Sequence, residues 1–375
     1  MDHPVKILVC PLNWGIGHAS RMIPLICKLL RSDTEVILAS GGKAGELLRT
    51  EFPSLPFIDL PSFPVRYSRN RSQVFIIMLQ LPAIIAGIIK EHRWLSKVIS
   101  SHHVDIVISD NRYGLYHKRI LSVFVSHQLS PLLPRGLKWM EPVIFHGLGM
   151  FINCFDRCWI PDAEDPSVNL SGRLSHRFTA FPNAAFMGIL SRFSELPVAP
   201  EEKEAETYDV LVILSGPEPQ RTLLEEILVR QLGKTNYKAA IIGGLHQPAR
   251  QDQNPSTSTV KFYYHLPATL FRAMLLKAGV VICRAGYSTI MDLMELGKPA
   301  ILIPTPGQPE QEYLASYLKG KSWFHMAEQP DFNLKKEMQE FQRQPFMQQG
   351  LFRTSTEKYV QDLLFLYEHK HKNGQ

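Results

Sequence analysis

The chain has 375 residues, of which 45% are hydrophobic and 20% charged, and its formal net charge is +6. One hydrophobic core rarely serves so long a chain, so we expect two domains. The composition is that of an ordinary globular protein and excludes a disordered one. The positive charge predicts an anionic partner, for which a nucleotide, a phospholipid headgroup and a nucleic acid all qualify.

The cysteines and the apolar runs bear on where the protein works. All five cysteines lie in or beside apolar runs, which predicts buried, reduced thiols in a cytosolic protein; they are Cys10, Cys27, Cys154, Cys158 and Cys283. Cys154 and Cys158 could face one another, but no further ligands with zinc spacing accompany them, and we expect no metal. No signal peptide is apparent, because the first apolar run, Ile7 to Cys10, is too short.

The chain opens with a predicted strand, a glycine loop and a helix. Val5 to Cys10 is the strand, Gly15-Ile16-Gly17-His18 is the loop, and apolar residues at helical spacing follow from Met22, with Pro24 in the first turn. The third glycine of a dinucleotide-binding fingerprint is missing, so that match is weak. His18 could take a proton from a bound hydroxyl at neutral pH, or it could cap the loop by hydrogen bonds.

Strands and helices then alternate, which predicts a parallel, doubly wound sheet. The expected strands are Glu35 to Ser40, Pro56 to Leu60, Val104 to Ser109, Leu121 to Ser126, Cys158 to Pro161 and Ala185 to Gly188, with a helix over Lys43 to Thr50. Polar residues follow two of these strands, at the sheet edge where we also expect His18. Asp110 could orient His18 or act as the base itself, and it could equally be a plain turn residue.

A basic and apolar stretch interrupts this pattern. Its apolar run, Val74 to Ile89, spans 16 residues, whereas a membrane-spanning helix needs roughly 20. Cations flank the run on both sides: Arg66, Arg69 and Arg71 before it, and Lys90, His92 and Arg93 after it. A helix lying on an anionic membrane and a core helix with solvated ends both fit; the similar segment Leu132 to Trp139 favours the membrane.

A charged segment with two prolines, Ser191 to Glu206, predicts a linker. We therefore divide the chain into a first domain over residues 1–192, a linker over 193–206, a second domain over 207–350 and a final helical segment over 351–375. In the second domain we expect strands at Tyr208 to Leu214, Ala239 to Ile242 and Lys261 to Tyr264, helices at Thr222 to Gln231 and Leu270 to Lys277, and a terminal helix at Glu357 to Glu368.

The most informative stretch runs from Val280 to Gln311. A buried strand, Val280 to Cys283, is followed by a glycine turn, a helix that begins near Tyr287, and a second strand, Ala300 to Pro304. Free amides and the dipole at such a helix start attract a phosphate, which predicts a nucleotide site. Alternatively the turn serves local geometry alone, and Thr289 and Asp292 form a capping box.

These motifs resemble glycosyltransferase family 28. The donor-binding motif of that family resembles Arg284-Ala285-Gly286-Tyr287-Ser288-Thr289, followed by Gly297-Lys298-Pro299 and Glu310-Gln311. Gly15-x-Gly17-His18 is similar to the family's amino-terminal loop. The best-known member adds N-acetylglucosamine to lipid I, and Ser109-Asp110-x-Arg112-Tyr113-Gly114 resembles more closely a poorly characterised bacterial and archaeal branch.

The resemblance implies a GT-B fold, in which two Rossmann-like domains face each other across a cleft and a final helix returns to the first domain. It implies an inverting transferase without metal or cofactor, with a UDP-sugar as donor, a glycan or lipid-linked hydroxyl as acceptor, and His18 with Asp110 as catalytic residues. The implied donor-binding residues are Gly15, Gly17, Arg192, Ser215, Gly216, Arg284, Gly286, Tyr287, Ser288, Thr289, Asp292, Glu310 and Gln311. Asn13, Arg112, His127 and Gln128 lie on the acceptor side.

Two departures from the family pattern affect the donor. Asp292 stands where the family has a glutamate for the ribose hydroxyls, and Glu310 stands where it has a glutamine, which puts N-acetylglucosamine as the donor sugar in doubt. A nucleotide-sugar hydrolase and a non-catalytic nucleotide-sugar-binding protein are the alternatives. We expect a cytoplasmic protein that contacts the inner face of the membrane peripherally, and no nucleic-acid partner, because basic runs interleaved with aromatic residues are absent.

Overall fold

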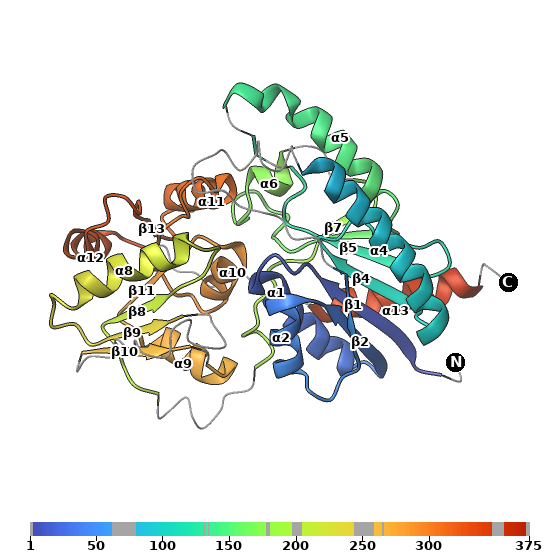
Figure 1. Cartoon of the computed structure of the whole chain (residues 1–375), viewed down its shortest axis with the longest axis horizontal. Coiled ribbons are helices and arrows are strands. Elements are labelled where there is room, and N and C mark those ends of the chain that lie inside the picture. The colour runs from blue at the N-terminus through green and yellow to red at the C-terminus, as the bar shows by residue number, and fades with distance from the viewer. Residues whose placement is uncertain are drawn as a thin grey trace. The chain divides into compact units, whose positions relative to one another are not determined.

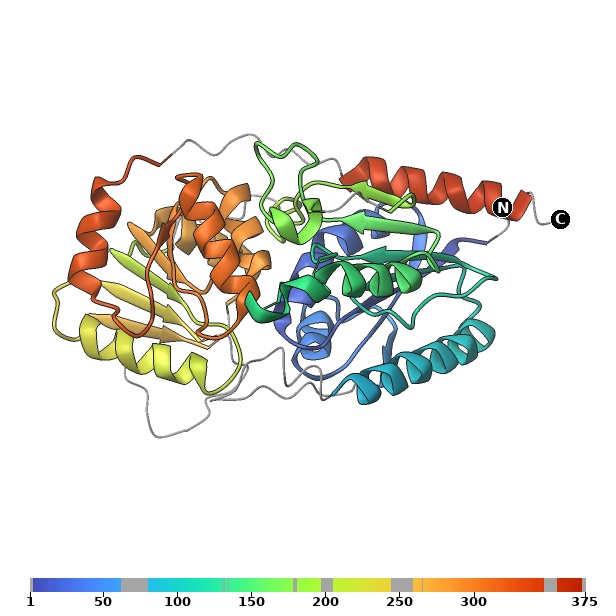
Figure 2. The ribbon, with the colours of Figure 1, turned by 90° about the horizontal axis from the view of Figure 1, so that it is seen from above.

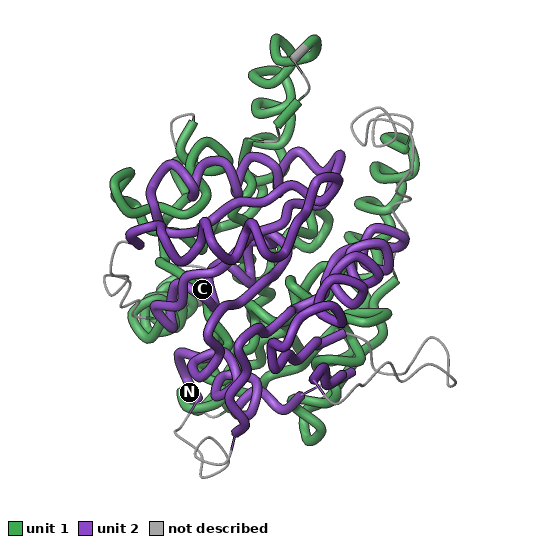
Figure 3. The backbone as a smooth tube through the Cα atoms, turned by 90° about the vertical axis from the view of Figure 1, so that its left-hand side faces the viewer, with its two compact units in different colours: residues 1–192, 352–375 green, residues 193–351 purple. Residues whose placement is uncertain are grey.

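The chain divides into two compact units. Unit 1 comprises Met1–Arg192 and Phe352–Gln375, and unit 2 comprises Phe193–Leu351 (Figure 3). The computed structural model describes residues 3–61, 80–130, 132–133, 135–177, 181–196, 205–243, 259–264, 266–346 and 356–372. Each unit contains one parallel sheet with helices on both faces, as the alternation of strand and helix patterns predicts (Figure 1).

Unit 1 holds a seven-stranded sheet of order β3-β2-β1-β4-β5-β6-β7. Its strands are β1 (Val5–Pro11), β2 (Thr34–Ser40), β3 (Phe57–Asp59), β4 (Ile106–Asp110), β5 (Leu121–Val125), β6 (Arg157–Ile160) and β7 (Ala184–Phe186). All pairs are parallel, and β1 lies beside both β2 and β4. The strand order therefore reverses between β1 and β4, and sheets of this kind bind ligands at the carboxyl ends of the strands flanking such a point.

Helices cover both faces of this sheet; they are α1 (Ile16–Leu30), α2 (Gly42–Glu51), α4 (Leu81–His102), α5 (Glu141–Ile152), α6 (Arg173–His176) and α13 (Thr356–Lys372), with the 3-10 helix η1 (Arg135–Met140) before α5. In Figure 2 the sheet lies between α4 and α13. Leu95 and Val98 of α4 share a buried cluster with Leu8 of β1. On the other side α13 is tied to the unit through Lys370, whose ammonium lies 2.7 Å from Asp156 and donates to the Ile120 carbonyl.

Unit 2 holds a six-stranded parallel sheet of order β10-β9-β8-β11-β12-β13. Its strands are β8 (Val210–Ile213), β9 (Ala239–Ile242), β10 (Val260–Tyr263), β11 (Val280–Cys283), β12 (Ala300–Leu302) and β13 (His325–Met326). Its helices are α8 (Gln220–Leu232), α9 (Ala268–Lys277), α10 (Tyr287–Glu295), α11 (Pro309–Gly320) and α12 (Leu334–Arg343). Apolar residues of α8 and α12 form one buried cluster with alternate residues of β8. The strand order reverses between β8 and β11, which places Ser215 and Arg284 after neighbouring strands.

The doubly wound parallel fold is thus confirmed, and several local predictions need correction. Helix α1 begins at Ile16, so Pro24 lies in the helix interior and not in its first turn. Cys154 is exposed after α5, whereas Cys158 is buried in β6, so the two thiols do not share a helix face and Cys154 is not a buried thiol.

Part of the basic and apolar stretch, residues 66–79, lies outside the described residues. The described part is α4, and only five of its 22 residues are buried. Its buried residues include Leu95, Val98 and Ile99, which pack in the core of unit 1, whereas Leu81, Ile85 and Ile89 are exposed. Both alternatives, a core helix with solvated ends and a helix lying on a membrane, therefore stay predictions. Among the helices that the structure describes, none is long and apolar enough to cross a membrane.

Candidate active site

In unit 1, His18, Asp110 and His127 come together at the carboxyl edge of the sheet. His18 lies in the first turn of α1, Asp110 is the last residue of β4, and His127 follows β5. The Nδ1 atom of His18 lies 2.9 Å from Oδ2 of Asp110. Asp110 is fully buried, whereas the His18 side chain keeps 21% of its surface exposed. One ring nitrogen is thus held by a carboxylate, and the imidazole remains accessible.

Arg21, which sequence reasoning missed, lies at the centre of this group. Its Nε atom donates to Oδ1 of Asp110 at 2.9 Å, and a second donor of the guanidinium bonds the same oxygen. Another donor lies 2.8 Å from Nδ1 of His127. His18 and Arg21 are three residues apart on one helix, so their side chains share a face. That spacing was visible in the sequence, but an arginine inside a helix pattern usually signals a solvated surface.

The surroundings hold His18 neutral and Asp110 ionised. Burial lowers the pKa of His18 below its ordinary value; the nearby Asp110 opposes this effect and the Arg21 cation adds to it. Burial alone would raise the pKa of Asp110, but Arg21 and His18 outweigh it, so the net pKa of this carboxyl is lowered. A neutral imidazole next to an ionised carboxylate at pH 7 is suited to general-base chemistry.

Of the predicted acceptor-side residues, Arg112 is buried, whereas Asn13 and Gln128 are half-buried. Arg112 is buried and bonds Glu91 of α4 at 2.6 Å, the Pro11 carbonyl at 3.1 Å and the Asn13 side chain at 3.3 Å. These contacts place Arg112 beneath the loop after β1, so the structure assigns it to holding that loop and not to its surface. Asn13 and Gln128 are half-buried at the same sheet edge, and Gly15 and Gly17 flank the start of α1.

In unit 2, helix α10 begins at Tyr287, with Gly286 as its N-cap residue and no side chain bonded as a cap. The amides of Tyr287, Ser288 and Thr289 therefore belong to the first helical turn, where a phosphate would bind. Asp292 is buried in the middle of the helix. The capping-box interpretation of Asp292 is wrong, because the helix starts five residues before it.

Arg284 lies directly before this turn and is fully buried. Its guanidinium donates to three main-chain carbonyl oxygens, those of Ile303, Pro304 and Gln220. Burial lowers the pKa of Arg284 to about 10, so it remains a cation at pH 7. A buried cation held by carbonyl groups gives this edge of the sheet a positive potential.

Several buried polar atoms at this edge have no hydrogen-bond partner within the described part of the chain; they are Nε of Arg284, Oγ1 of Thr305, and the side-chain oxygens of Gln308 and Gln329. Such atoms are rare in native proteins, and a bound polar ligand or ordered water at this edge would satisfy them. Gly216 has a positive φ of 99°, and a Cβ there would lie 3.5 Å from Oγ1 of Thr305. The loop after β8 thus approaches Thr305 closely, with Ser215 half-buried beside it.

The remaining predicted donor-site residues lie near the same edge or at its margin. Gln311, in the first turn of α11, accepts a hydrogen bond from the Thr305 amide at 2.9 Å, so its amide group holds the loop after β12. Glu310 precedes it in the same turn and is half-buried. Arg192 is the last residue of the first segment of unit 1 and is half-buried. Sequence reasoning missed Thr305, although its position directly after a strand could have suggested it.

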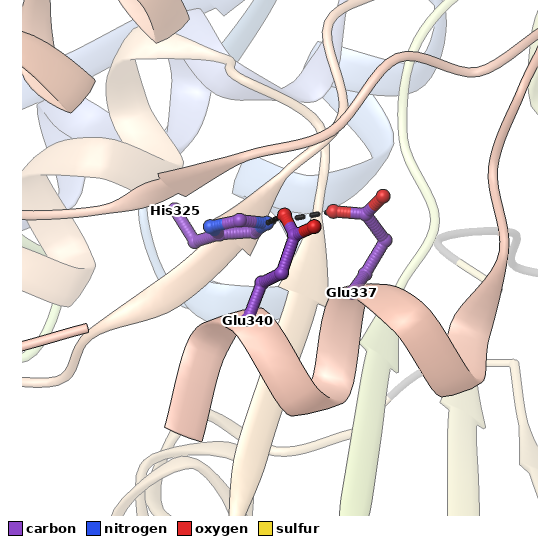
Figure 4. A group of neighbouring side chains, drawn as sticks. All are labelled: His325, Glu337 and Glu340. Atoms are coloured by element: carbon purple, nitrogen blue, oxygen red, sulfur yellow. Dashed lines mark hydrogen bonds and ion pairs between the residues drawn. The ribbon is translucent and has the colours of Figure 1, made fainter. Parts of the chain in front are cut away.

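Elsewhere in unit 2, His325 of β13 meets Glu337 and Glu340 of α12 (Figure 4). Both ring nitrogens of His325 are engaged: Nε2 lies 2.6 Å from Glu337 and Nδ1 lies 3.2 Å from Gln344. The Lys336 ammonium lies within 4 Å of both carboxylates. These contacts account for the group as a charged link between α12 and the edge strand.

Known proteins resemble this chain in sequence. Residues 211–359 match the model of the glycosyltransferase family 28 C-terminal domain. The chain is 23% identical over 358 residues to the UDP-N-acetylglucosamine–N-acetylmuramyl-(pentapeptide) pyrophosphoryl-undecaprenol N-acetylglucosamine transferase of Histophilus somni, covering 90% of this chain and 88% of that protein. A shorter match to the transferase of the same name from Methylobacterium sp. is 39% identical over 61 residues, 16% of this chain and 15% of that protein.

Solved structures show the same fold. The glycosyltransferase SnogD from Streptomyces nogalater superimposes with a TM-score of 0.61 at 13% identity, over 97% of this chain and 100% of that one. MurG of Acinetobacter baumannii gives a TM-score of 0.53 at 14% identity, over 91% and 90% of the two chains. The protein is therefore a glycosyltransferase with the two parallel-sheet domains of the GT-B fold. Its carboxyl-terminal domain is that of glycosyltransferase family 28.

Proposed function

We propose that the protein transfers a sugar from a UDP-sugar to a hydroxyl acceptor with inversion and without a metal ion. The single observation that carries this proposal is the pairing of His18 with Asp110 at 2.9 Å. A neutral imidazole held on one side by an ionised carboxylate is the arrangement that a general base requires. The named relatives are transferases, which favours transfer over hydrolysis.

The donor diphosphate would bind unit 2 where α10 begins. The first-turn amides and the helix dipole offer about half a positive charge, and the buried Arg284 adds a full one. The hydroxyl of Thr305 would supply a further hydrogen bond, because its oxygen has no partner among the residues that the structure describes. Positive groups fixed in this way offset the charge that develops on the leaving diphosphate, which is the task that a metal ion performs in other transferases.

In the reaction that we propose, Nε2 of His18 accepts the proton of the acceptor hydroxyl. The acceptor oxygen forms a bond to the anomeric carbon, the bond from that carbon to the diphosphate breaks, and UDP leaves with the electron pair. Asp110 holds the Nδ1 proton and stabilises the imidazolium that forms. The proposal requires that the donor held by unit 2 reach the hydroxyl activated by unit 1.

The acceptor that we propose is lipid-linked, and α4 and α5 support this choice. Leu81, Ile85 and Ile89 follow one another at every fourth position of α4, so they form one stripe, and their side chains are 52%, 45% and 48% exposed. Lys90 and Arg93 lie exposed near the end of this stripe. Trp139, Val143 and Met150 give η1 and α5 a second exposed apolar face. Apolar stripes beside cations suit an anionic membrane surface.

The direct test is incubation of the protein with a panel of UDP-sugars, with and without lipid extract. We expect UDP release that depends on the extract, and a new glycolipid. His18→Ala is expected to abolish turnover while the affinity for UDP stays within about threefold, because the base acts mainly in the transition state. Release of UDP at the same rate without acceptor would identify a hydrolase. Full activity of His18→Ala would show that another group is the base.

A further inference from the structure

Arg21 is a buried cation among the ionisable groups of the site, and only 2% of its surface is exposed. Its guanidinium reaches Asp110 through two donors, His127 through a third, and lies 2.9 Å from Nδ1 of His18. A plain ion pair with Asp110 would not need contacts with both imidazoles. The geometry therefore points to a role in controlling protons, and this role rests on the proposed function of His18.

The protonation of each neighbour follows from the chemistry of arginine. A guanidinium is always protonated in proteins and can only donate hydrogen bonds. Nδ1 of His127 must therefore accept, which leaves the proton of the neutral ring on its Nε2. Nδ1 of His18 lies 2.9 Å from both the Asp110 carboxylate and the Arg21 guanidinium. These two contacts compete, because an Nδ1 lone pair would accept from Arg21 but face the carboxylate, whereas a protonated Nδ1 donates to Asp110 and accepts nothing from Arg21. The Arg21 nitrogen concerned already donates to Oδ1 of Asp110, so it keeps a partner when Nδ1 is protonated. We therefore take the protonated Nδ1, which leaves Nε2 of His18 with its lone pair.

We propose that Arg21 is a positioning residue for the transfer reaction: it fixes the Asp110 carboxylate and the His127 ring so that Nε2 of His18 is the atom that accepts the proton. Both oxygens of Asp110 are then assigned, Oδ1 to Arg21 and Oδ2 to His18. Because Oδ1 is occupied by two donors, the carboxylate cannot rotate away from His18.

Electrostatics supports the same role. The charged and titratable groups recorded near His18 are Asp110 from β4, Arg21 from α1 and His127 after β5. Asp110 favours the imidazolium, whereas Arg21 and burial oppose it, and the net effect is a lowered pKa of His18. After the hydroxyl proton moves to Nε2, the imidazolium lies beside the Arg21 cation. This repulsion favours release of the proton from Nε2 to water, which restores the neutral base.

The proposal can be tested on the wild-type protein by ¹⁵N NMR of the histidine rings, which reports the proton position in each imidazole. The signals of His18 and His127 are assigned by comparison with His18→Gln and His127→Gln. We expect neutral His18 to carry its proton on Nδ1 and neutral His127 to carry it on Nε2. A proton on Nδ1 of His127, or on Nε2 of neutral His18, would overturn the proposal without any need for an Arg21 variant.

Variants of Arg21 then separate its charge from its geometry. Arg21→Gln removes the cation, and we expect the midpoint of the His18 titration to rise by about one pH unit. Arg21→Lys keeps the charge, so the midpoint should stay near the wild-type value. Arg31→Gln is the control: it removes the same charge at the residue that directly follows α1, about 15 Å further along the helix axis and beyond the screening length. An unchanged midpoint and tautomer in folded Arg21→Gln would refute the role.

These measurements need no turnover, so they separate this inference from the proposed function. If the expected tautomers are found and no UDP-sugar reacts, the proposed function fails and the role of Arg21 in proton placement stands. If sugar transfer is found and the tautomers are reversed, the transferase stands and the inference about Arg21 fails. Where transfer is found, the acidic limb of the kcat/KM profile should move upward in Arg21→Gln by the same amount as the titration.

Discussion

Asp110→Asn tests the site most sharply, because it changes a single charge and almost no volume. Asp110 is fully buried, and Arg21, its principal partner, is 2% exposed. Removing the carboxylate charge leaves a buried guanidinium without compensation, which typically costs about 3–5 kcal/mol. For a unit of this size each kcal/mol lowers Tm by about 2–4 °C, so we expect a fall of roughly 6–20 °C.

The stabilisation that Asp110 contributes should depend on pH in a predictable direction. The pKa of Asp110 is lowered in the folded chain, so its stabilisation is present above the ordinary aspartate pKa, near pH 4, and is lost as the pH falls further. The contribution of the Asp110 charge to the difference in unfolding free energy between wild type and variant should therefore be lost as the pH falls below about 4. Between pH 7 and pH 4 the difference should not narrow, because loss of Asp110 lowers the pKa of His18 further in the variant. The assay is chemical denaturation across this range, followed by fluorescence.

A matched control is available in the same unit. Asp59→Asn makes the identical change in the Arg49–Asp59 pair, whose side chains are 49% and 85% exposed. Its stability should stay within error of wild type, because exposed ion pairs contribute little. The kcat of Asp110→Asn should fall about 100-fold or more, since His18 loses its partner. If Asp110→Asn keeps both the Tm and the kcat of wild type, Asp110 neither stabilises the fold nor assists His18 in catalysis, and the reasoning is refuted.

Two further predictions concern the donor site and the apolar stripe. Thr305→Val should weaken UDP binding about 2–10-fold in calorimetry without loss of stability, because the hydroxyl has no partner within the described ranges of the chain. Thr235→Val, whose hydroxyl donates to the Leu232 carbonyl, is the control. An equal Kd for UDP in both variants would remove Thr305 from the site. Replacing Leu81, Ile85 and Ile89 together by Gln should reduce cosedimentation with anionic vesicles at least tenfold. The control is Leu223→Gln, at an exposed position of unit 2, which should not reduce cosedimentation. Unchanged cosedimentation of the triple variant would argue against membrane contact.

Much of the fold was predictable because its signals are local. The strand Val280–Cys283 and the helix that starts at Tyr287 follow from an apolar run, a glycine and a change of period within a few residues. Helices α5, α11 and α12 were not predicted. In α12 the apolar residues, Leu334, Met338 and Phe341, stand among charged neighbours, and their common face appears only when they join the buried cluster of unit 2.

In the candidate site too, some residues were predictable from sequence and the role of others was not. His18 and Asp110 were named from the loop and the strand end, because the carboxyl ends of parallel strands meet at one edge. Arg112 was assigned to the acceptor side, and only the packing of α4 shows that its guanidinium is used beneath the loop by Glu91. A side chain at a strand end can point to the ligand or into the protein, and the pattern alone does not distinguish these.

By itself, the sequence determined that two doubly wound α/β halves are present and that glycine turns precede the helices of their sites, because periodicity and turn chemistry act over a few residues. The tertiary structure decided how the charges are distributed among those turns. Arg21 and Asp110 are 89 positions apart in the chain and bond directly. Thr305 lies beside Gly216, and no other described residue bonds its hydroxyl. Such contacts depend on strand order and helix packing, which bring together residues that no local pattern connects.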